Sequence, residues 1–437
     1  MHAYKAAGNA APGNVSESRN MVVTKVAVAM LGARRHYAVP RLLHEAGLLD
    51  RFFTDSYMGN KPWLEAGLRA VPAGMRPSAV ERWLGRKDDV LPPGKVTSFE
   101  RLGLWYGHAR QRAGSSTRAH EVAREAALRF NRNILKVGLG EAQVVWGFNG
   151  VALELFETSK RQGRLCVLDQ TILPRALEQR LLKQEQARWP GWEQDVRDWS
   201  RPLAMDGREE VEWDLADAIV AGSAFVRDGL RELGVPAEKI YVIPYGVDLN
   251  RFEAPAGGLS RPGSEEGRLK VLFAGQVGLR KGVPDLLEAM RQFQAGEIKL
   301  RLAGGVSLRN EKLGEYKTDA EFLGHVPRTR MRDLLQWADV FVLPSIVEGS
   351  ATVTYEAIMS GCPVIASPNA GSIIQDGVDG FIVPTRSPDK IAGALRRYRD
   401  ESKLLYAHRD ALRETRKRAG LERYKADLVR LIQGLGR

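Results

Sequence analysis

Residues 340–363 read VFVLPSIVEGSATVTYEAIMSGCP. The first four residues, Val340–Leu343, predict a buried strand, and Pro344 ends it because proline cannot donate to a strand ladder. A helix is expected from about Thr352 to Ser360, where a glycine and then a proline stop it. The stretch therefore predicts a strand, a loop and a helix in direct succession.

The loop of this unit carries Glu348 and Gly349. At the carboxyl edge of a parallel sheet, such a loop and the helix after it present free N–H groups and a positive helix end, which bind phosphate. Gly349 lets the backbone come close to a ligand. Glu348 and Glu356 are candidates to bracket that ligand, one at ribose hydroxyls and the other at a sugar. The alternative is two surface glutamates beside a helix dipole.

A second turn of this kind lies upstream, in VLFAGQVGLRK at residues 271–281. Gly275 and Gly278 interrupt it, and Arg280 and Lys281 stand just before the next helix. Arginine can grip a pyrophosphate through two hydrogen bonds, and lysine acts as a point charge. Two fixed cations would stabilise a departing nucleoside diphosphate without a metal. The alternative is a solvated turn with two surface cations.

Outside these turns, apolar β-branched runs alternate with amphipathic stretches, which is typical of α/β proteins with parallel sheets. The 437 residues suit two large domains. We expect a disordered tail at 1–20, a Rossmann-like domain at 21–240 and a second at 241–414, with the linker GGLSRPGSEEG at 257–267. A final helix at about 415–437 is a candidate to pack back on the first domain.

The net charge of +12 favours anionic partners, namely nucleotide phosphates or acidic lipid head groups, although plain solubility explains it equally well. Nucleic acid is not expected as a partner, because zinc-finger cysteine pairs and RNP-like aromatic strands are missing. Cys166 and Cys362 sit in apolar runs and indicate buried thiols in a reducing compartment, hence a cytoplasmic location, with a disulfide as the weaker alternative. The sequence has no apolar run of ~18 residues.

Six segments, in order over about residues 212–384, resemble motifs of the retaining glycosyltransferases of family 4, which have the GT-B fold. They are Glu212-x3-Ala216-Asp217 with Ser223, Ile243-Pro-Tyr-Gly-Val-Asp248, Gly275 to Lys281-Gly282, Phe322-Leu-Gly-His-Val-Pro327, Glu348-x7-Glu356, and Asp376-Gly377 to Pro384. The resemblance implies two Rossmann-like domains whose parallel sheets face each other across a cleft. It also implies a nucleotide-sugar donor and no cofactor.

Carried over to this chain, the resemblance implies a role for each matched residue. Lys281 would hold the donor pyrophosphate with Arg280, Glu348 would contact the transferred sugar, and Glu356 would bind ribose hydroxyls. The base would lie beside His325 and Val326, and the phosphates would face the N–H groups near Thr352 and Val353. The remaining donor-side candidates are Gly275, Gln276, Gly278, Gly349, Ser350 and Ala351. The implied reaction retains the anomeric configuration and needs no metal.

Several positions depart from the family pattern. Gln276 replaces a usual arginine, so Arg280 is expected to supply that charge, and Tyr245 replaces a common asparagine. Ser350-Ala351 stands in place of Phe-Gly. Ser372 also stands where a glutamate is common.

The largest departure is in the first domain, where the family has a Gly-rich loop after the first strand and a histidine after a later one. Here the first loop is LGARRH at residues 31–36, and Asp169 follows the strand at 165–168. The acceptor-side candidates are Gly32, Arg34, Arg35 and Asp169. The alternative is that Arg34 and Arg35 belong to a basic surface loop and that Asp169 is an N-cap or turn residue.

The sequence thus predicts a glycosyltransferase acting on a glycan, lipid or small-molecule acceptor. The alternative is a catalytically inactive GT-B protein that binds nucleotides or docks on acidic membranes. Peripheral contact with an anionic membrane is a further hypothesis, based on the net charge, Arg34, Arg35 and the segment Trp105-Tyr106 with Arg110 and Arg112.

Overall fold

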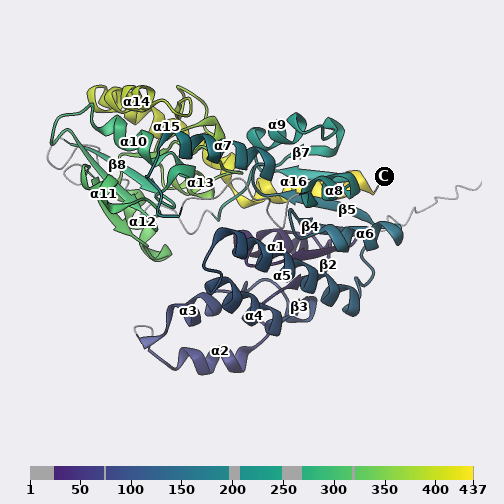
Figure 1. The fold of residues 1–437 in the computed structure, drawn as a ribbon. Coiled ribbons are helices and arrows are strands. Elements are labelled where there is room, and N and C mark those ends of the chain that lie inside the picture. The colour runs from purple at the N-terminus through teal and green to yellow at the C-terminus, as the bar shows by residue number, and fades with distance from the viewer. Residues whose placement is uncertain (1–23, 73–74, 196–206, 249–267, 317–319, 437) are drawn as a thin grey trace, which may run out of the picture.

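The computed structural model describes residues 24–72, 75–195, 207–248, 268–316 and 320–436. These residues form two parallel sheets, each covered by helices (Figure 1). The predicted α/β class with two Rossmann-like domains is therefore confirmed. The expected tail at 1–20 and the expected linker at 257–267 lie outside the described residues.

Among the described residues, the first sheet has seven strands in the order β3-β2-β1-β4-β5-β6-β7. The strands are β1 (Val26–Met30), β2 (Leu49–Thr54), β3 (Val96–Ser98), β4 (Val144–Phe148), β5 (Leu165–Gln170), β6 (Ala218–Ala221) and β7 (Ile240–Val242). The helices of this half are α1 (Ala38–Glu45), α2 (Pro62–Arg69), α3 (Ser78–Leu84), α4 (Glu100–Gln111), α5 (Ser116–Val137), α6 (Leu153–Arg161), α7 (Arg175–Arg188), α8 (Arg208–Leu215) and α9 (Ala224–Glu232). Short 3-10 turns are η1 (Arg34–Tyr37), η3 (Pro93–Lys95) and η4 (Ala237–Lys239).

The second sheet has six strands among the described residues, in the order β10-β9-β8-β11-β12-β13. They are β8 (Leu269–Ala274), β9 (Ile298–Ala303), β10 (Ala320–Gly324), β11 (Val340–Leu343), β12 (Val364–Ala366) and β13 (Gly380–Ile382). The helices are α10 (Val283–Met290), α11 (Asn310–Gly314), α12 (Arg328–Trp337), α13 (Thr352–Met359), α14 (Pro388–Asp400), α15 (Ser402–Ala419) and α16 (Leu421–Leu435), with 3-10 turns η6 (Leu279–Lys281) and η7 (Pro368–Ala370).

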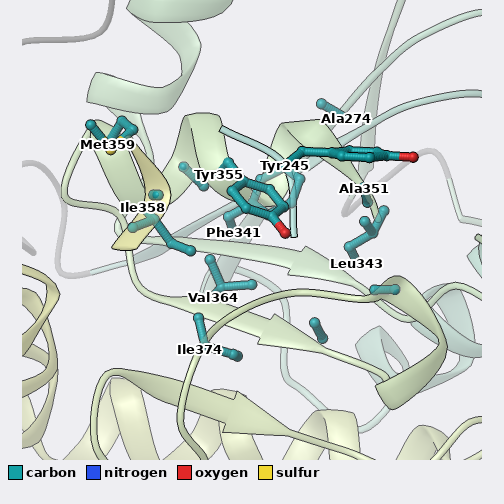
Figure 2. Close-up of a cluster of buried hydrophobic side chains, with 14 of the residues drawn as sticks. Tyr245, Ala274, Phe341, Leu343, Ala351, Tyr355, Ile358, Met359, Val364 and Ile374 are labelled. Carbon is teal, nitrogen blue, oxygen red and sulfur yellow. The ribbon is translucent and has the colours of Figure 1, made fainter. Parts of the chain in front are cut away.

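The central strands are buried on both faces, which is why they read as continuous apolar runs rather than alternating ones. Every residue of β1, β4 and β11 is buried. Figure 2 shows Tyr245, from the connection after β7, among buried side chains of β11, α13 and β12. The core of the second domain is therefore continuous with the connection between the domains.

Two expected boundaries differ from the structure. The domain limit placed after residue 240 falls inside β7, whose residues Ile240–Val242 pair with β6 in the first sheet. The expected start of a last helix near 415 lies inside α15, and the break comes at Gly420 with an extended backbone. Both differences arise because the chain leaves a sheet or a helix at a point set by tertiary packing rather than by a strong local signal.

The last helix, α16, crosses back to the first domain (Figure 1, yellow). It lies against α1, where Lys425 pairs with Glu45 at 3.3 Å. Its Tyr424 is fully buried. The first domain is thus completed by the end of the chain.

Helix α7 also joins the two halves, in the opposite direction. Its Arg188 pairs with Asp285 of α10 at 2.7 Å, and its Glu185 pairs with Arg386 at 2.5 Å. These ion pairs are partly buried, since the carboxylates of Glu185 and Asp285 are each only 1% exposed. None of the helices in the described parts of the chain has the length and apolarity needed to cross a bilayer.

Candidate functional site

The site is built around the loop between β11 and α13, residues 344–351, which we call the Glu348 loop. Its Glu348 is 9% exposed and pairs with Arg280 at 2.7 Å and, at closer range, with Lys281. The backbone holds the same arrangement, because the N–H groups of Ile346 and Val347 donate to the carbonyl of Arg280 at 2.9 and 3.2 Å. The structure therefore brings the two cations and the carboxylate of the sequence prediction together.

Glu348 is the shared partner of two cations that repel each other, since burial and the charge of Arg280 lower the pKa of Lys281 although Glu348 opposes the shift. Burial opposes ionisation of Glu348, but the charges of Lys281 and Arg280 overcome it and hold the pKa of Glu348 below its usual value. The two cations differ in access, since the side chain of Arg280 is 37% exposed and that of Lys281 is 11% exposed. Arg280 is therefore the more accessible of the two cations.

A glycine allows the Glu348 loop to approach η6 so closely. Gly282 has φ +66°, and a Cβ there would lie 2.1 Å from the carbonyl oxygen of Pro344. Only glycine fits a left-handed conformation with another backbone at that distance. The Lys281-Gly282 pair in the sequence is thus a cation followed by the glycine that lets the neighbouring loop reach it.

Helix α13 begins at this loop without a side-chain cap. Ala351 is its N-cap residue and makes no side-chain hydrogen bond, and the half-buried Thr352 and Val353 form its first turn. The N–H of Ala351 itself donates to the carbonyl of Ala370 at 2.9 Å. Thr352 and Val353 lie in the first turn of the helix, where backbone N–H groups can face an anion, so their role stays a prediction. The N–H of Ala351 cannot serve in this way, because it already donates to Ala370.

The other donor-side candidates are more scattered. Glu356 is half-buried on α13, Gln276 is exposed after β8, and Ser350 is buried with its hydroxyl 2.7 Å from Tyr355. Gly275 and Gly278 form the turn between β8 and η6. His325 and Val326 follow β10, and two strands, β9 and β8, separate β10 from β11. No contact joins this pair to Glu348 among the described residues.

Gly349 is one of the points at which the two domains meet. A Cβ on it would lie 1.9 Å from the carbonyl oxygen of Thr171, in the segment after β5. The hydroxyl of Ser223, at the start of α9, donates to the carbonyl of Gly349 at 2.5 Å. The Glu348 loop is therefore held against the carboxyl edge of the first sheet as well as that of the second.

The acceptor-side candidates form a second buried cluster at that edge. Arg35 makes an ion pair with Asp169, which is 0% exposed, and donates to Tyr424 at 2.5 Å. Its guanidinium lies 4.1 Å from the ring centre of Tyr245. The neighbouring Arg34 donates to the hydroxyl of Thr171 at 2.8 Å. A basic surface loop is therefore wrong as a description of Arg34 and Arg35.

This first loop has an unusual backbone. Arg35, His36 and Tyr37 have φ values of +48°, +49° and +61°, all in the left-handed region. Residues other than glycine avoid that region, because adopting it costs roughly 1–2 kcal/mol per residue. Gly32, which the sequence singled out, takes φ +87° and donates its N–H to Asp55 at 2.8 Å. Gly32 begins the loop, and the buried contacts of Arg35 hold residues 35–37 in the left-handed conformation.

Sequence reasoning missed four residues of the site. Glu178 of α7 faces Arg280, and burial raises the pKa of Glu178 although Arg280 opposes the shift. Ser223 was noted only as part of a motif, Tyr245 only as a departure, and Tyr424 not at all. None of the motifs in the sequence includes Glu178, which lies in the charged stretch that forms α7.

Two regions of the chain match known protein families. Residues 268–400 match the family described as Glycosyl transferases group 1, and residues 185–251 match Glycosyltransferase Family 4. These two regions are therefore similar to the family 4, or group 1, glycosyltransferases. They hold Glu185, Ser223, Lys281 and Glu348.

Curated relatives match part of the chain. A D-inositol 3-phosphate glycosyltransferase of Xylanimonas cellulosilytica is 33% identical over 194 residues, which is 40% of this chain and 46% of the relative. An alpha-maltose-1-phosphate synthase of Mycolicibacterium smegmatis is 26% identical over 214 residues, 43% of this chain and 55% of the relative. The chain therefore spans about half the length of the curated relatives it matches.

Solved structures share the whole fold at low identity. Anabaena HepE in complex with UDP and glucose has a TM-score of 0.58 and 14% identity, covering 94% of this chain and 100% of HepE. Sucrose-phosphate synthase from Thermosynechococcus elongatus has a TM-score of 0.60 and 18% identity, covering 94% and 99%. These likenesses place the two sheets of the chain in the GT-B fold.

Proposed function

We propose that this glycosyltransferase moves a sugar from a nucleoside-diphosphate sugar to an acceptor held by the first domain. The observation that carries the proposal is the Glu348 cluster, in which Arg280 and Lys281 stand beside the open start of α13. Cations and free N–H groups at the carboxyl edge of a parallel sheet bind phosphate. A GT-B neighbour, HepE, was solved with UDP and glucose, which supports a nucleotide as a ligand.

The cations would act on the leaving group. When the bond between the anomeric carbon and the phosphate oxygen breaks, negative charge moves onto the diphosphate. A guanidinium and an ammonium already positioned beside the diphosphate stabilise that charge more than water does. Arg280, the more exposed cation, would turn to the diphosphate, and Lys281 would bridge it to Glu348.

The carboxylate of the cluster would act on the transferred sugar. Glu348, paired with the cations, would accept hydrogen bonds from sugar hydroxyls and so orient the anomeric carbon. Retention of the anomeric configuration and independence of metal ions belong to the same proposal, and the family resemblance supports them. In such a mechanism the two cations take the place that a divalent ion holds in other transferases.

A screen of UDP- and GDP-sugars tests the proposal in two steps. Isothermal titration of the full chain with UDP and GDP is expected to show binding of one of them, and incubation with the matching sugar donor should release free nucleotide. Failure of every nucleotide to bind would overturn the function. Binding without turnover, across a broad panel of acceptors, would instead favour an inactive GT-B protein.

Two further measurements test the finer claims. Activity that persists in EDTA supports metal independence, and loss of activity that Mg²⁺ or Mn²⁺ restores contradicts it. Proton NMR of the first product formed reports the anomeric configuration. Inversion relative to the donor would contradict a retaining mechanism.

A further inference from the structure

The segment 173–195 forms a strut between the two domains, and we call it the α7 strut after its helix. The segment follows β5 of the first sheet, and the next helix of the described residues, α8, again lies against β5 and α6 of the first domain. In Figure 1, α7 is drawn between α9 of the first domain and α13 of the second. The contacts at the two ends of the strut show how it is fixed.

The start of the strut is fixed to the first domain. Glu209 of α8 is buried and accepts the N–H of Arg175, the first residue of α7, at 2.7 Å. This N–H is one of those that a helix start leaves without a partner inside the helix. On α9, a Cβ at Gly229 would lie 2.5 Å from Leu173 and 3.1 Å from Leu177. The first domain therefore sets where α7 begins and how closely it packs.

The end of the strut is fixed to the second domain. Arg188 donates through Nη1 to Oδ2 of Asp285 at 2.9 Å, and its Nη2 lies 2.7 Å from Oδ1. Asp285 lies in the first turn of α10, which directly follows Gly282. Beyond α7, the N–H of Gln194 donates to the carbonyl of Ser307 at 3.0 Å. The strut thus holds the start of α10 and the connection after β9.

A further contact of the strut holds a residue in an unfavourable conformation. Arg386, between β13 and α14, has φ +60°, in the left-handed region that residues other than glycine avoid. Its Nε donates to Glu185 at 2.5 Å and its Nη2 to Gln184 at 2.9 Å. A conformation of this kind persists only where the surrounding contacts fix it. The contacts of α7 supply that restraint on the second domain.

Between its two anchored ends, the strut lies against the donor-side elements. Helix α7 contacts η6, the turn that carries Arg280. Leu177 of α7 belongs to a small buried apolar cluster that also contains Ile346 and Val347 of the Glu348 loop. The N–H groups of those two residues donate to the carbonyl of Arg280. A shift of α7 would therefore move the Glu348 loop and η6 together.

The strut also brings a charge to this place. Glu178 follows Leu177 on α7, is half-buried, and is attracted electrostatically by the guanidinium of Arg280. Glu348 pairs with the same guanidinium at 2.7 Å. Arg280 therefore has one carboxylate partner from each domain, and opposite charges at this range restrict where the guanidinium can point.

We propose that the α7 strut positions the charges of the donor site, with Arg188 and Glu178 as positioning residues. Arg188 acts through Asp285 on the start of α10 and so on Lys281, which stands just before it. Glu178 acts directly on Arg280. The role of these cations at a diphosphate rests on the proposed function, whereas the coupling of the strut to the Glu348 loop is measurable without a ligand.

Arg188→Met and Arg188→Lys test the proposal in the full chain. The two new side chains have similar lengths, so they differ mainly in the charge that faces Asp285. In Arg188→Met, the affinity for UDP or GDP is expected to fall about tenfold or more, on the scale of one charge-assisted contact, and Arg188→Lys should retain most of it. The matched control is Arg180→Met, which breaks a 2.7 Å pair with Glu232 inside the first domain. It should leave the affinity unchanged.

A merely structural role would give a different result. Partial unfolding of Arg188→Met would lower the stoichiometry of the titration but leave the Kd of the folded molecules unchanged, and that outcome would overturn the proposal. Removal of Arg188 alone leaves a buried carboxylate without its partner, which can prevent folding. The double variant Arg188→Met/Asp285→Asn removes both charges, and it should show the same loss of affinity.

Glu178→Gln separates orientation of Arg280 from binding. The variant keeps the size of the side chain and removes its charge. We expect kcat for nucleotide release from the sugar donor to fall about tenfold, because a misdirected cation stabilises the leaving group less well. The affinity for UDP or GDP should not fall, since a negative charge near the phosphates is gone. Unchanged kcat, with Glu232→Gln as control, would remove Glu178 from the proposal.

Hydrogen exchange of the ligand-free protein separates the strut from the proposed function. The amides of Ile346 and Val347 should exchange about tenfold faster in Arg188→Met than in Arg180→Met, while Val28 of β1 exchanges equally in both. If no nucleotide binds the parent protein and this difference appears, the proposed function fails and the strut stands. If nucleotides bind and neither affinity nor exchange differs between the variants, the strut fails and the proposed function stands.

Discussion

Ser223 of the first domain donates a hydrogen bond to the carbonyl of Gly349 in the second, at 2.5 Å. Thr171 contacts the same glycine from the other side. Gly349 is therefore enclosed by the backbone and side chains of the opposite domain, one residue from Glu348. Closure of the two domains and placement of the Glu348 carboxylate depend on the same short segment.

Gly349→Ala is expected to force the domains apart. The new Cβ would lie 1.9 Å from the carbonyl oxygen of Thr171 and 2.7 Å from its carbon, and backbone atoms cannot turn aside. Misplacement across a site on this scale costs about a hundredfold in catalytic efficiency. Small-angle scattering should show a larger radius of gyration. Gly393→Ala, which meets open space in α14, is the control and should change neither quantity.

Lys281→Met should weaken nucleotide binding about 10- to 100-fold, which corresponds to one charge-assisted contact. The variant keeps the length of the side chain but leaves Glu348 with Arg280 alone. Titration calorimetry with UDP and GDP measures the loss. The control, Lys299→Met, removes an exposed lysine of β9. Unchanged affinity in Lys281→Met would remove the pyrophosphate role from this residue.

Glu348→Gln should destabilise the protein in a pH-dependent way. Because the folded protein holds the pKa of Glu348 below its ordinary value, the stability from this carboxylate is fully present above that ordinary value. It is lost as pH falls through the lowered pKa. The variant is expected to be about 3 kcal/mol less stable at pH 7, as for a broken buried pair.

Thermal melts from pH 7 downward measure this difference. The gap between the parent protein and Glu348→Gln should close as the pH falls below 4, about the ordinary pKa of glutamate. Glu321→Gln, which breaks a pair between Arg301 and a half-exposed carboxylate, should cost no more than about 1 kcal/mol. A constant gap across the whole pH range would contradict the ion cluster.

Asp169→Asn should release the first loop. The ion pair with Asp169 helps to hold Arg35 in a left-handed conformation, and without it the loop can leave that conformation. Amide exchange at residues 35–37 is expected to rise about tenfold or more, as for a loss of 1.4 kcal/mol. Asp228→Asn, at an exposed pair with Arg227, serves as the control. Equal exchange in both variants would mean that the aromatic contacts of Arg35 hold the loop alone.

The second domain was the more predictable half. Val340–Leu343 forms the expected strand, and α13 spans Thr352–Met359, one residue short of the expectation. These elements carry strong local signals, namely a buried apolar run, a proline at its end and a glycine after the helix. Lys281 and Glu348 were each predicted as donor-side residues, and in the structure they form an ion pair.

The first domain was less predictable because its site is assembled from distant segments. Arg35, Asp169 and Tyr424 meet in one buried cluster although 134 and 389 residues separate Arg35 from the other two. No period or spacing in a sequence records such a contact. The run of three left-handed residues is likewise invisible locally, since none of Arg35, His36 and Tyr37 favours that conformation.

By itself, the sequence determined the α/β architecture and the donor-side motifs, because hydrophobic period, proline and glycine act over a few residues. Only the tertiary structure decided that Gly349 joins the domains and that α16 completes the first one. It alone gathered Arg35, Asp169 and Tyr424 in one buried cluster. The physical reason is that buried charges need partners, and the fold brings those partners from any distance along the chain.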